Sequence, residues 1–206
     1  MNSNNNNDLL YESALEFERF LNKKIILILG RKYKKKIIEI NFLPENFHHL
    51  VGLHKLKDIV SVSKGKASNI FNSIIYGDIS FKSIENSSYL SQIEKRLEIV
   101  SELTYLLSNK NTVFKFCKLK IPNSNLRWDY LIEAQTKEEY TCYLFIRYQR
   151  DNKNNVLVSC FPKREDYGFK QTRYTLLQTS LVDKDGNEKI FYERPNYNAN
   201  DSQLNH

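Results

Sequence analysis

Val113-Phe114-Lys115-Phe116-Cys117-Lys118-Leu119 is the stretch that best decides the fold of this 206-residue chain. Lysines interrupt a run of aromatic and aliphatic residues, which is typical of a β-strand with one solvated face. Further segments share this β-favouring composition. The six predicted strands are residues 112–119, 126–134, 139–148, 156–161, 174–182 and 189–193. Turn residues separate them, among them Asp185-Gly186. The C-terminal half is therefore predicted to form an antiparallel sheet of about five to six strands.

The N-terminal half has the periodicity of helices. One predicted helix begins at Asp8, and three others cover residues 44–53, 66–76 and 87–107. The last is the clearest, because apolar residues between Leu90 and Leu107 recur at three- and four-residue steps. Two β-like segments, IILILG and IIEINF, lie on either side of the basic run 31–36, which suggests a hairpin. The predicted fold class is α+β, with N-terminal helices packed on an antiparallel β-sheet.

The composition predicts one domain, because 206 residues suit a single hydrophobic core. We expect this domain to cover residues 8–193, between a disordered Asn-rich tail (1–7) and a polar C-terminal tail (194–206). The N-terminus has no apolar signal segment, and no run approaches the roughly 20 apolar residues that span a bilayer. No membrane association is therefore expected.

The three cysteines, Cys117, Cys142 and Cys160, are odd in number and widely spaced in hydrophobic runs. This arrangement favours reduced, buried core thiols over ligands or nucleophiles. Reduced thiols are typical of a reducing compartment, so a cytoplasmic location is expected.

The excess of positive charge indicates a polyanionic partner, and the alternative interpretation is an ordinary solvated surface. The chain has 31 Lys and Arg against 24 Asp and Glu, a net charge of +7. Clustered cations bind phosphates by releasing counterions. The residues predicted to bind nucleic acid are Arg31, Lys32, Lys34, Lys35, Lys36, Arg147 and Arg173. RNA is the expected partner.

Three of the four histidines, His48, His49 and His54, fall within seven residues. On a helix, His54 would share a face with Phe47 and Leu50, so we expect at least one imidazole to point toward the core. The interpretations are a buried histidine bonded to backbone, acid–base catalysis, or a metal site. The spacing matches no HExxH pattern and no Cys or carboxylate recurs at a ligand step, so no metal or other cofactor is predicted.

Complementary groups follow a predicted strand, at Lys163, Arg164 and Tyr167. If this strand end faces the histidines, the site would have a base, cations for a phosphate and a hydroxyl donor. Cleavage of RNA without a metal needs these parts. Other chemistries have little support, because the chain contains no GxGxxG, no GxxxxGK[ST] and no GxSxG sequence.

The segment Phe47-His48-His49-Leu50-Val51-Gly52-Leu53-His54 resembles the Phe-x-His-Leu-x-Gly stretch of the phage-associated branch of the Barnase–EndoU–colicin–RelE nuclease superfamily. Ser159-Cys160-Phe161-Pro162-Lys163-Arg164-Glu165-Asp166-Tyr167, with Gln171 and Tyr174-Thr175-Leu176-Leu177, resembles its C-terminal strand block. The order of elements over residues 8 to 193 also fits. Val51 departs from the pattern, which would have a small hydroxyl residue there.

The resemblance implies a metal-independent ribonuclease, often a toxin or a weapon of a mobile element, with a neutralising protein partner. It places the acid or base at one of His48, His49 and His54, and phosphate contacts at Lys163, Arg164 and Tyr167. The first hypothesis is therefore an RNA endonuclease that leaves a 2′,3′-cyclic phosphate. The alternatives are a non-catalytic nucleic-acid or nucleoprotein binder, such as a phage-encoded inhibitor of a host or defence complex, and a protein-binding module rich in tyrosine.

Overall fold

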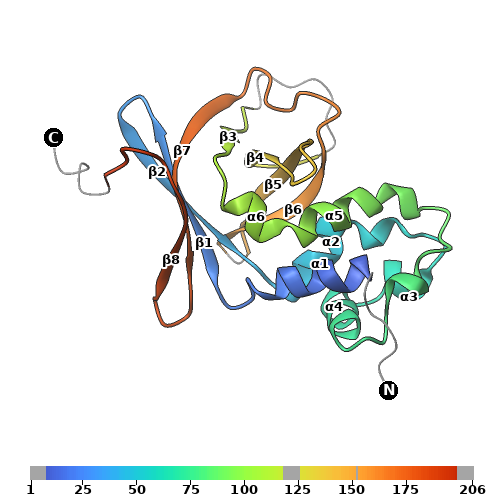
Figure 1. Ribbon diagram of the computed structural model, residues 1–206. Helices are drawn as coiled ribbons and strands as arrows, with labels where there is room; N and C mark the ends of the chain where they lie inside the picture. Colours follow the sequence, from blue (N-terminus) through green and yellow to red (C-terminus); the bar gives the residue numbers. More distant parts are fainter. Residues whose placement is uncertain (1–7, 118–125, 152, 199–206) are drawn as a thin grey trace.

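The computed structural model describes residues 8–117, 126–151 and 153–198, and it has an α+β architecture. The helices gather beside one end of a strongly curved sheet (Figure 1). The strands are β1 Lys24–Arg31, β2 Lys34–Asn41, β3 Thr112–Lys115, β4 Tyr130–Gln135, β5 Thr141–Gln149, β6 Asn154–Pro162, β7 Thr172–Val182 and β8 Glu188–Glu193. The α-helices are α1 Leu9–Glu18, α2 Pro44–Val51, α3 Val60–Ser63, α4 Ala67–Ile75, α5 Glu94–Ser101 and α6 Leu103–Leu107, with 3-10 turns η1 Leu53–Lys55, η2 Phe81–Ser83 and η3 Leu90–Gln92.

The sheet is larger than predicted and is not purely antiparallel. Its eight strands have the order β1-β2-β6-β5-β4-β3-β7-β8, and β1 also pairs with β7, which closes the sheet on itself. The N-terminal hairpin belongs to the same sheet as the C-terminal strands, so the prediction of five to six strands was too low. The prediction of an antiparallel sheet was wrong at one junction, because β2 and β6 run parallel.

The junction of β2 with β6 is short, and it positions the rest of the molecule. Only two residue pairs join these strands, Ile40 with Asn155 and Asn41 with Val156. Among the described residues, β2 pairs with no residue of β6 beyond Val156. Helices α2 and α5 lie against β6. The chain turns into α2 directly after β2, and α2 packs against β6.

The predicted helices are confirmed in part. Asp8 caps α1, because its carboxylate accepts a hydrogen bond from the backbone N–H of Tyr11 at 2.9 Å. The prediction of one helix over residues 87–107 was wrong. The chain forms a 3-10 turn and then breaks at Glu102 between α5 and α6. The break lets Thr104 donate its backbone N–H to Glu16 of α1 at 2.7 Å, a contact that local periodicity does not encode.

Two clusters of buried side chains lie on the two faces of the sheet. The larger cluster joins the helices to the sheet through residues such as Phe17, Phe47 and Leu144. The smaller is aromatic and is built around Trp128, Tyr143 and Phe145. Burial of both faces explains why several strands are nearly continuous in apolar residues.

The cysteines are reduced, and two of the three are buried as expected. Cys142 and Cys160 are buried, whereas Cys117 is only half-buried, so the prediction of a core thiol was wrong there. Burial raises the pKa of Cys160 to about 12, which keeps that thiol protonated and inert.

The structure describes only part of the two predicted tails. Residues 1–7 and 199–206 lie outside the described residues. The start of the predicted C-terminal tail is bonded to the sheet, because Arg194 donates its backbone N–H to the Leu177 carbonyl at 2.8 Å. Within the described ranges, none of the helices has the length and apolar character required to pass through a bilayer.

Candidate functional site

Helix α2 and the turn after it bring the three histidines together. Pro44 occupies the first turn of α2, where its missing N–H costs nothing. Gly52 ends the helix with φ +85°, a left-handed conformation that favours glycine. The 3-10 turn η1 then returns the chain, so His54 lies beside His48 and His49.

His48 is the imidazole that points into the protein. Only 4% of its surface is exposed. Its Nε2 lies 2.8 Å from the backbone carbonyl of Val62, which can only accept, so Nε2 carries the proton. Nδ1 therefore holds a lone pair, and it is buried without a hydrogen-bond partner among the described residues. The expectation of an inward histidine is confirmed, although at His48 and not at His54.

His49 and His54 are exposed and lie over this buried ring. The ring centres of His49 and His54 are 5.2 Å apart, and those of His48 and His49 are 5.5 Å apart. The prediction that His54 shares the buried face of Phe47 was wrong, because Gly52 ends the helix before that residue.

Two of the three imidazoles are held neutral at pH 7. Burial lowers the pKa of His48, against the opposing effect of the Val62 carbonyl. Burial of part of the ring lowers the pKa of His54 to about 4, and positive charge at the other histidines, Lys55 and Arg96 adds to this effect. A neutral imidazole has a free lone pair, so both can accept a proton or a metal ion.

His49 lines a hollow of about 430 Å³ that Leu157 and Val158 of β6 also line. Two arginines share the hollow with this imidazole, Arg127 before β4 and Arg147 on β5. The other lining residues are Asn46, Leu126, Gln149, Leu157 and Val158. An imidazole and two guanidinium groups around one cavity can bind a phosphate and move a proton next to it.

The hollow continues into a longer groove. A second cavity of about 1070 Å³ shares Arg127, Arg147 and Gln149 with it and extends past Tyr148 and Arg150. Arg127, Arg147 and Arg150 are exposed at the surface of this groove. Two aspartates, Asp129 and Asp151, also line this groove, so its lining has three arginines against two carboxylates.

Arg96 of α5 links the histidine turn to β6. It is 9% exposed and donates from Nη1 to the Ser159 hydroxyl at 2.9 Å. Its guanidinium also lies 5.4 Å from the ring centre of Phe161. Leu50 of α2 approaches the same strand, since its carbonyl lies 3.6 Å from the Cys160 sulfur. These contacts fix α2 and its histidines against β6.

The group predicted as the second half of the site, Lys163, Arg164 and Tyr167, follows the end of β6 and lies outside the hollow. Lys163 pairs with Glu133 at 2.8 Å, and Tyr167 packs against Tyr143 and Phe145 in the aromatic cluster. Lys163 follows Val158 by five residues, which is about 16 Å along a strand. The described residues that line the His49 hollow do not include Lys163, Arg164 or Tyr167.

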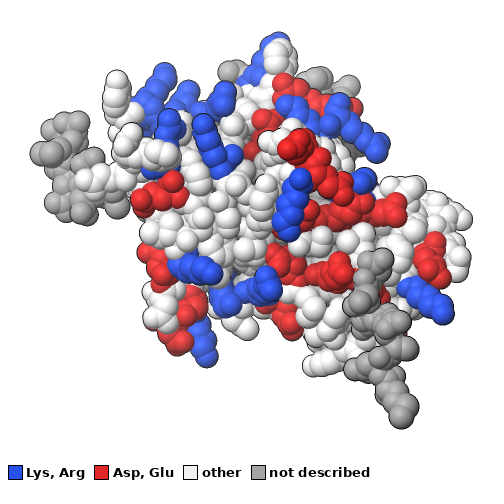
Figure 2. All heavy atoms as spheres, viewed as in Figure 1, with Lys and Arg blue, Asp and Glu red and all other residues white. Residues whose placement is uncertain are grey.

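The basic run 31–36 lies at the tip of the β1–β2 hairpin. Lys32 and Tyr33 form the turn with φ of 48° and 62°. Figure 2 shows Lys and Arg side chains gathered over this hairpin. Aromatic rings lie among them, because Arg31 stands 6.0 Å from the Tyr174 ring centre and Lys35 stands 4.8 Å from that of Tyr197. Of the other predicted cations, Arg173 donates to Thr112 at 3.4 Å.

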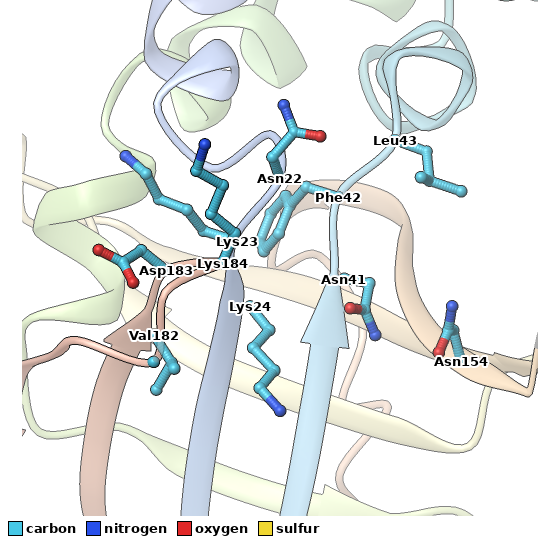
Figure 3. Close-up of a pocket in the computed structure, with 11 residues that line it drawn as sticks. Asn22, Lys23, Lys24, Asn41, Phe42, Leu43, Asn154, Val182, Asp183 and Lys184 are labelled. Carbon is cyan, nitrogen blue, oxygen red and sulfur yellow. The ribbon is translucent and has the colours of Figure 1, made fainter.

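A further cavity, of about 450 Å³, opens where β1, β2 and β7 meet (Figure 3). Lysines line it, but two of them are engaged. Lys24 pairs with Glu39 at 2.9 Å, and Lys23 donates to the Arg19 carbonyl at 2.9 Å. It contains no histidine among its described lining residues, so it offers no group that exchanges protons near pH 7.

Sequence reasoning missed Arg127, Asn46 and Gln149. A signal existed for Arg127, because it is a cation next to the single tryptophan of the chain, at the start of a predicted strand. Asn46 and Gln149 carry no pattern of their own. The hollow unites residues from α2, β5 and the segment before β4, so their proximity depends on the sheet topology.

Comparison with known proteins identifies a family. A family model described as "phage-Barnase-EndoU-ColicinE5/D-RelE like nuclease4" matches residues 9–200. Searches of curated proteins and of solved structures found no significant match. The family match covers the helices, the sheet and both walls of the hollow.

Proposed function

The chain belongs to the phage-Barnase-EndoU-ColicinE5/D-RelE like nuclease family, and we propose that it is a metal-independent RNA endonuclease acting in the His49 hollow. One observation carries the proposal: His49, Arg127 and Arg147 line the same cavity, with Leu157 and Val158 of β6. Nuclease chemistry follows from the family, whereas the choice of RNA follows from this set of side chains.

Each side chain of the hollow has a separate role in phosphodiester cleavage. His49 takes the proton of a ribose 2′-hydroxyl, whose oxygen then attacks the neighbouring phosphorus. Arg127 and Arg147 donate hydrogen bonds to the non-bridging oxygens, where negative charge accumulates. The bond from phosphorus to the 5′-oxygen breaks, that oxygen takes a proton from a solvent water, and the imidazolium of His49 returns its proton to the solvent. The products are a 2′,3′-cyclic phosphate and a 5′-hydroxyl.

The neighbouring histidines suit supporting roles. His54 has a pKa of about 4, so at pH 7 it is uncharged and adds no positive charge beside His49. His48 supports the ring of His49 from beneath, and its own position is set by Val62. The exposed Arg164, just after β6, offers a second phosphate contact outside the hollow, whereas Lys163 is paired with Glu133.

The basic hairpin favours a second candidate function, a nucleic-acid binder without catalysis. Its exposed lysines and the Tyr33 ring, which is fully exposed, suit contact with phosphates and bases. In the endonuclease the same surface would hold RNA away from the reaction centre. The two functions therefore differ in whether bound RNA is cut.

The test uses a labelled RNA in buffer with EDTA. Wild-type protein should cut it, and a single 2′-deoxy substitution at the cleaved position should block the cut. His49→Ala should lower the rate by at least 10²-fold, the scale of general acid–base catalysis. Arg127→Ala and Arg147→Ala should each lower it strongly, whereas Arg19→Ala, an exposed arginine of the α1 end, is the matched control.

Several outcomes would contradict the proposal. Wild-type protein that retains RNA on a filter but never cuts it would establish the binder. Cleavage that requires a divalent metal, or that ignores the 2′-deoxy substitution, would exclude the mechanism. A toxin role further predicts that wild-type expression arrests bacterial growth while His49→Ala expression does not, and that a neutralising protein partner relieves the arrest.

A further inference from the structure

We propose that His48, His49 and His54 form a binding site for a transition-metal ion, with Zn²⁺ as the expected occupant. One ring nitrogen of each residue can serve as a ligand, and these atoms all lie within 4.8 Å of one another. The proposal concerns inhibition and not the reaction itself, because a metal on these rings would occupy the imidazole that we assign to proton transfer.

The strongest support comes from the buried ring. His48 is 4% exposed, and its Nδ1 has no hydrogen-bond partner among the described residues. An unsatisfied buried nitrogen costs free energy, which a ligand at that atom would recover. The other nitrogen donates to the Val62 carbonyl at 2.8 Å. A backbone carbonyl on the opposite side of the ring is the usual support of a metal-bound histidine, because it fixes the tautomer.

The two exposed rings can complete the site by small rotations. In a tetrahedral zinc site with Zn–N bonds of about 2.0–2.1 Å, neighbouring nitrogens are roughly 3.4 Å apart. The present separation of up to 4.8 Å therefore has to shrink by about 1.4 Å. His49 and His54 are free to move at the surface, whereas His48 is held by Val62. Three ligands leave the fourth position for water or a phosphate oxygen.

The donor set selects the metal. Three imidazoles suit Zn²⁺, Cu²⁺ or Ni²⁺, whereas Mg²⁺ and Ca²⁺ require oxygen ligands. The described residues of the cluster include no carboxylate. Lys55 and Arg96 add positive charge near His54, which opposes a cation. The affinity for zinc should therefore be lower than in sites whose histidines are hydrogen-bonded to carboxylates. Loss of such a partner typically lowers metal affinity by about 10–100-fold.

Metal binding predicts reversible inhibition of the nuclease, and this consequence rests on the proposed function. A lone pair that is bound to zinc cannot accept the proton of a 2′-hydroxyl. Zinc should therefore abolish RNA cleavage, and a chelator should restore it. The binding itself requires no nuclease activity, so it can be tested separately.

The experiment titrates metal-free, full-length protein with Zn²⁺ by calorimetry, and with Co²⁺ to detect the visible absorption of a low-symmetry site. One ion per chain is expected. His54→Ala, at an exposed position that should leave the fold intact, should weaken zinc affinity at least tenfold. His206→Ala removes a histidine outside the described residues and serves as the matched control. His48→Gln retains a donor for Val62 and should also lose the site.

The outcomes separate this proposal from the proposed function. Absence of stoichiometric binding, or equal affinity in His54→Ala and wild type, overturns the metal site and leaves the nuclease untouched. Zinc binding in a protein that cuts no RNA supports the site and contradicts the nuclease. Stoichiometric binding that leaves RNA cleavage unchanged contradicts the inhibitory role of the site.

Discussion

At the scale of single residues, the cluster combines one buried and two exposed imidazoles. Residues 48 and 49 are neighbours in sequence but have opposite environments, because successive residues of a helix point in different directions. His48 is fixed by Val62, and His49 stands at the hollow with Arg127 and Arg147. The buried ring of His48 is held in place, and the exposed ring of His49 beside it lines the hollow.

The lowered pKa values predict a loss of stability in acid. In the unfolded chain a histidine titrates near 6.5, whereas His54 titrates at about 4 in the folded protein. The unfolded state therefore binds more protons between these values, so this contribution to stability is complete above pH 6.5 and is lost as pH falls toward 4. His48 acts in the same direction.

The measurement is the urea midpoint of unfolding at pH 7.5 and at pH 5. We expect wild-type protein to lose more stability between these pH values than His54→Gln, which cannot titrate. Above pH 7.5 the two proteins should follow parallel curves. Equal losses in acid for both would show that the folded environment does not perturb His54.

At the scale of elements, the turn at Gly52 decides where His54 lies. A Cβ at this position would meet the side chains of Arg96 and Ile93 at 3.3 Å, in a backbone conformation of φ +85°. Gly52→Ala should cost about 1–2 kcal/mol from the left-handed conformation alone. It should also displace η1 and separate His54 from His49.

Gly77 offers a matched control for this substitution. Its φ is +84°, and a Cβ there would meet nothing within 4 Å. Gly77→Ala should therefore carry the same backbone cost, measured as a shift in the denaturation midpoint, without any effect at the site. RNA cleavage and zinc affinity should fall only in Gly52→Ala. Equal falls in both variants would mean that general destabilisation, and not the histidine geometry, controls the site.

At the scale of the whole molecule, the proposed endonuclease would bind one RNA with two basic surfaces. The groove at the end of β5 is lined by three exposed arginines, and the β1–β2 hairpin carries the lysine run (Figure 2). Clustered cations bind phosphates by counterion release, so affinity should fall steeply with salt. The closure of the sheet by β1 and β7 makes the hairpin a fixed part of the same body as the groove.

Salt dependence measures the contribution of the hairpin. In the cleavage-deficient His49→Ala protein, Lys32→Ala with Lys34→Ala should reduce the slope of log K against log salt by about 1.4, at roughly 0.7 for each phosphate of a single strand. Lys64→Ala with Lys82→Ala, two exposed lysines of the helical part, is the control. An unchanged slope in the hairpin variant would remove this surface from the RNA-binding site.

The sequence by itself determined the fold class, most strand positions and the inward histidine, because periodicity and local turn residues encode these features directly. It also carried the family resemblance through residues 47 to 54, which the match over residues 9–200 confirms. The sequence predicted one helix over residues 87–107 because its apolar period continues through Glu102, where the chain breaks between α5 and α6. The contact between Thr104 and Glu16 of α1 at this break is not encoded in the local pattern.

Only the tertiary structure decided which cations accompany the histidines. Lys163 and Arg164 were expected there on the strength of their order in the chain, whereas the sheet brings Arg127 and Arg147 to the hollow. The reason is physical: side chains separated by about a hundred residues meet only through strand pairing and helix packing, which no local pattern records. The hollow lies between residues of α2, β5, β6 and the segment before β4, which the sheet order β6-β5-β4 and the packing of α2 on β6 bring together.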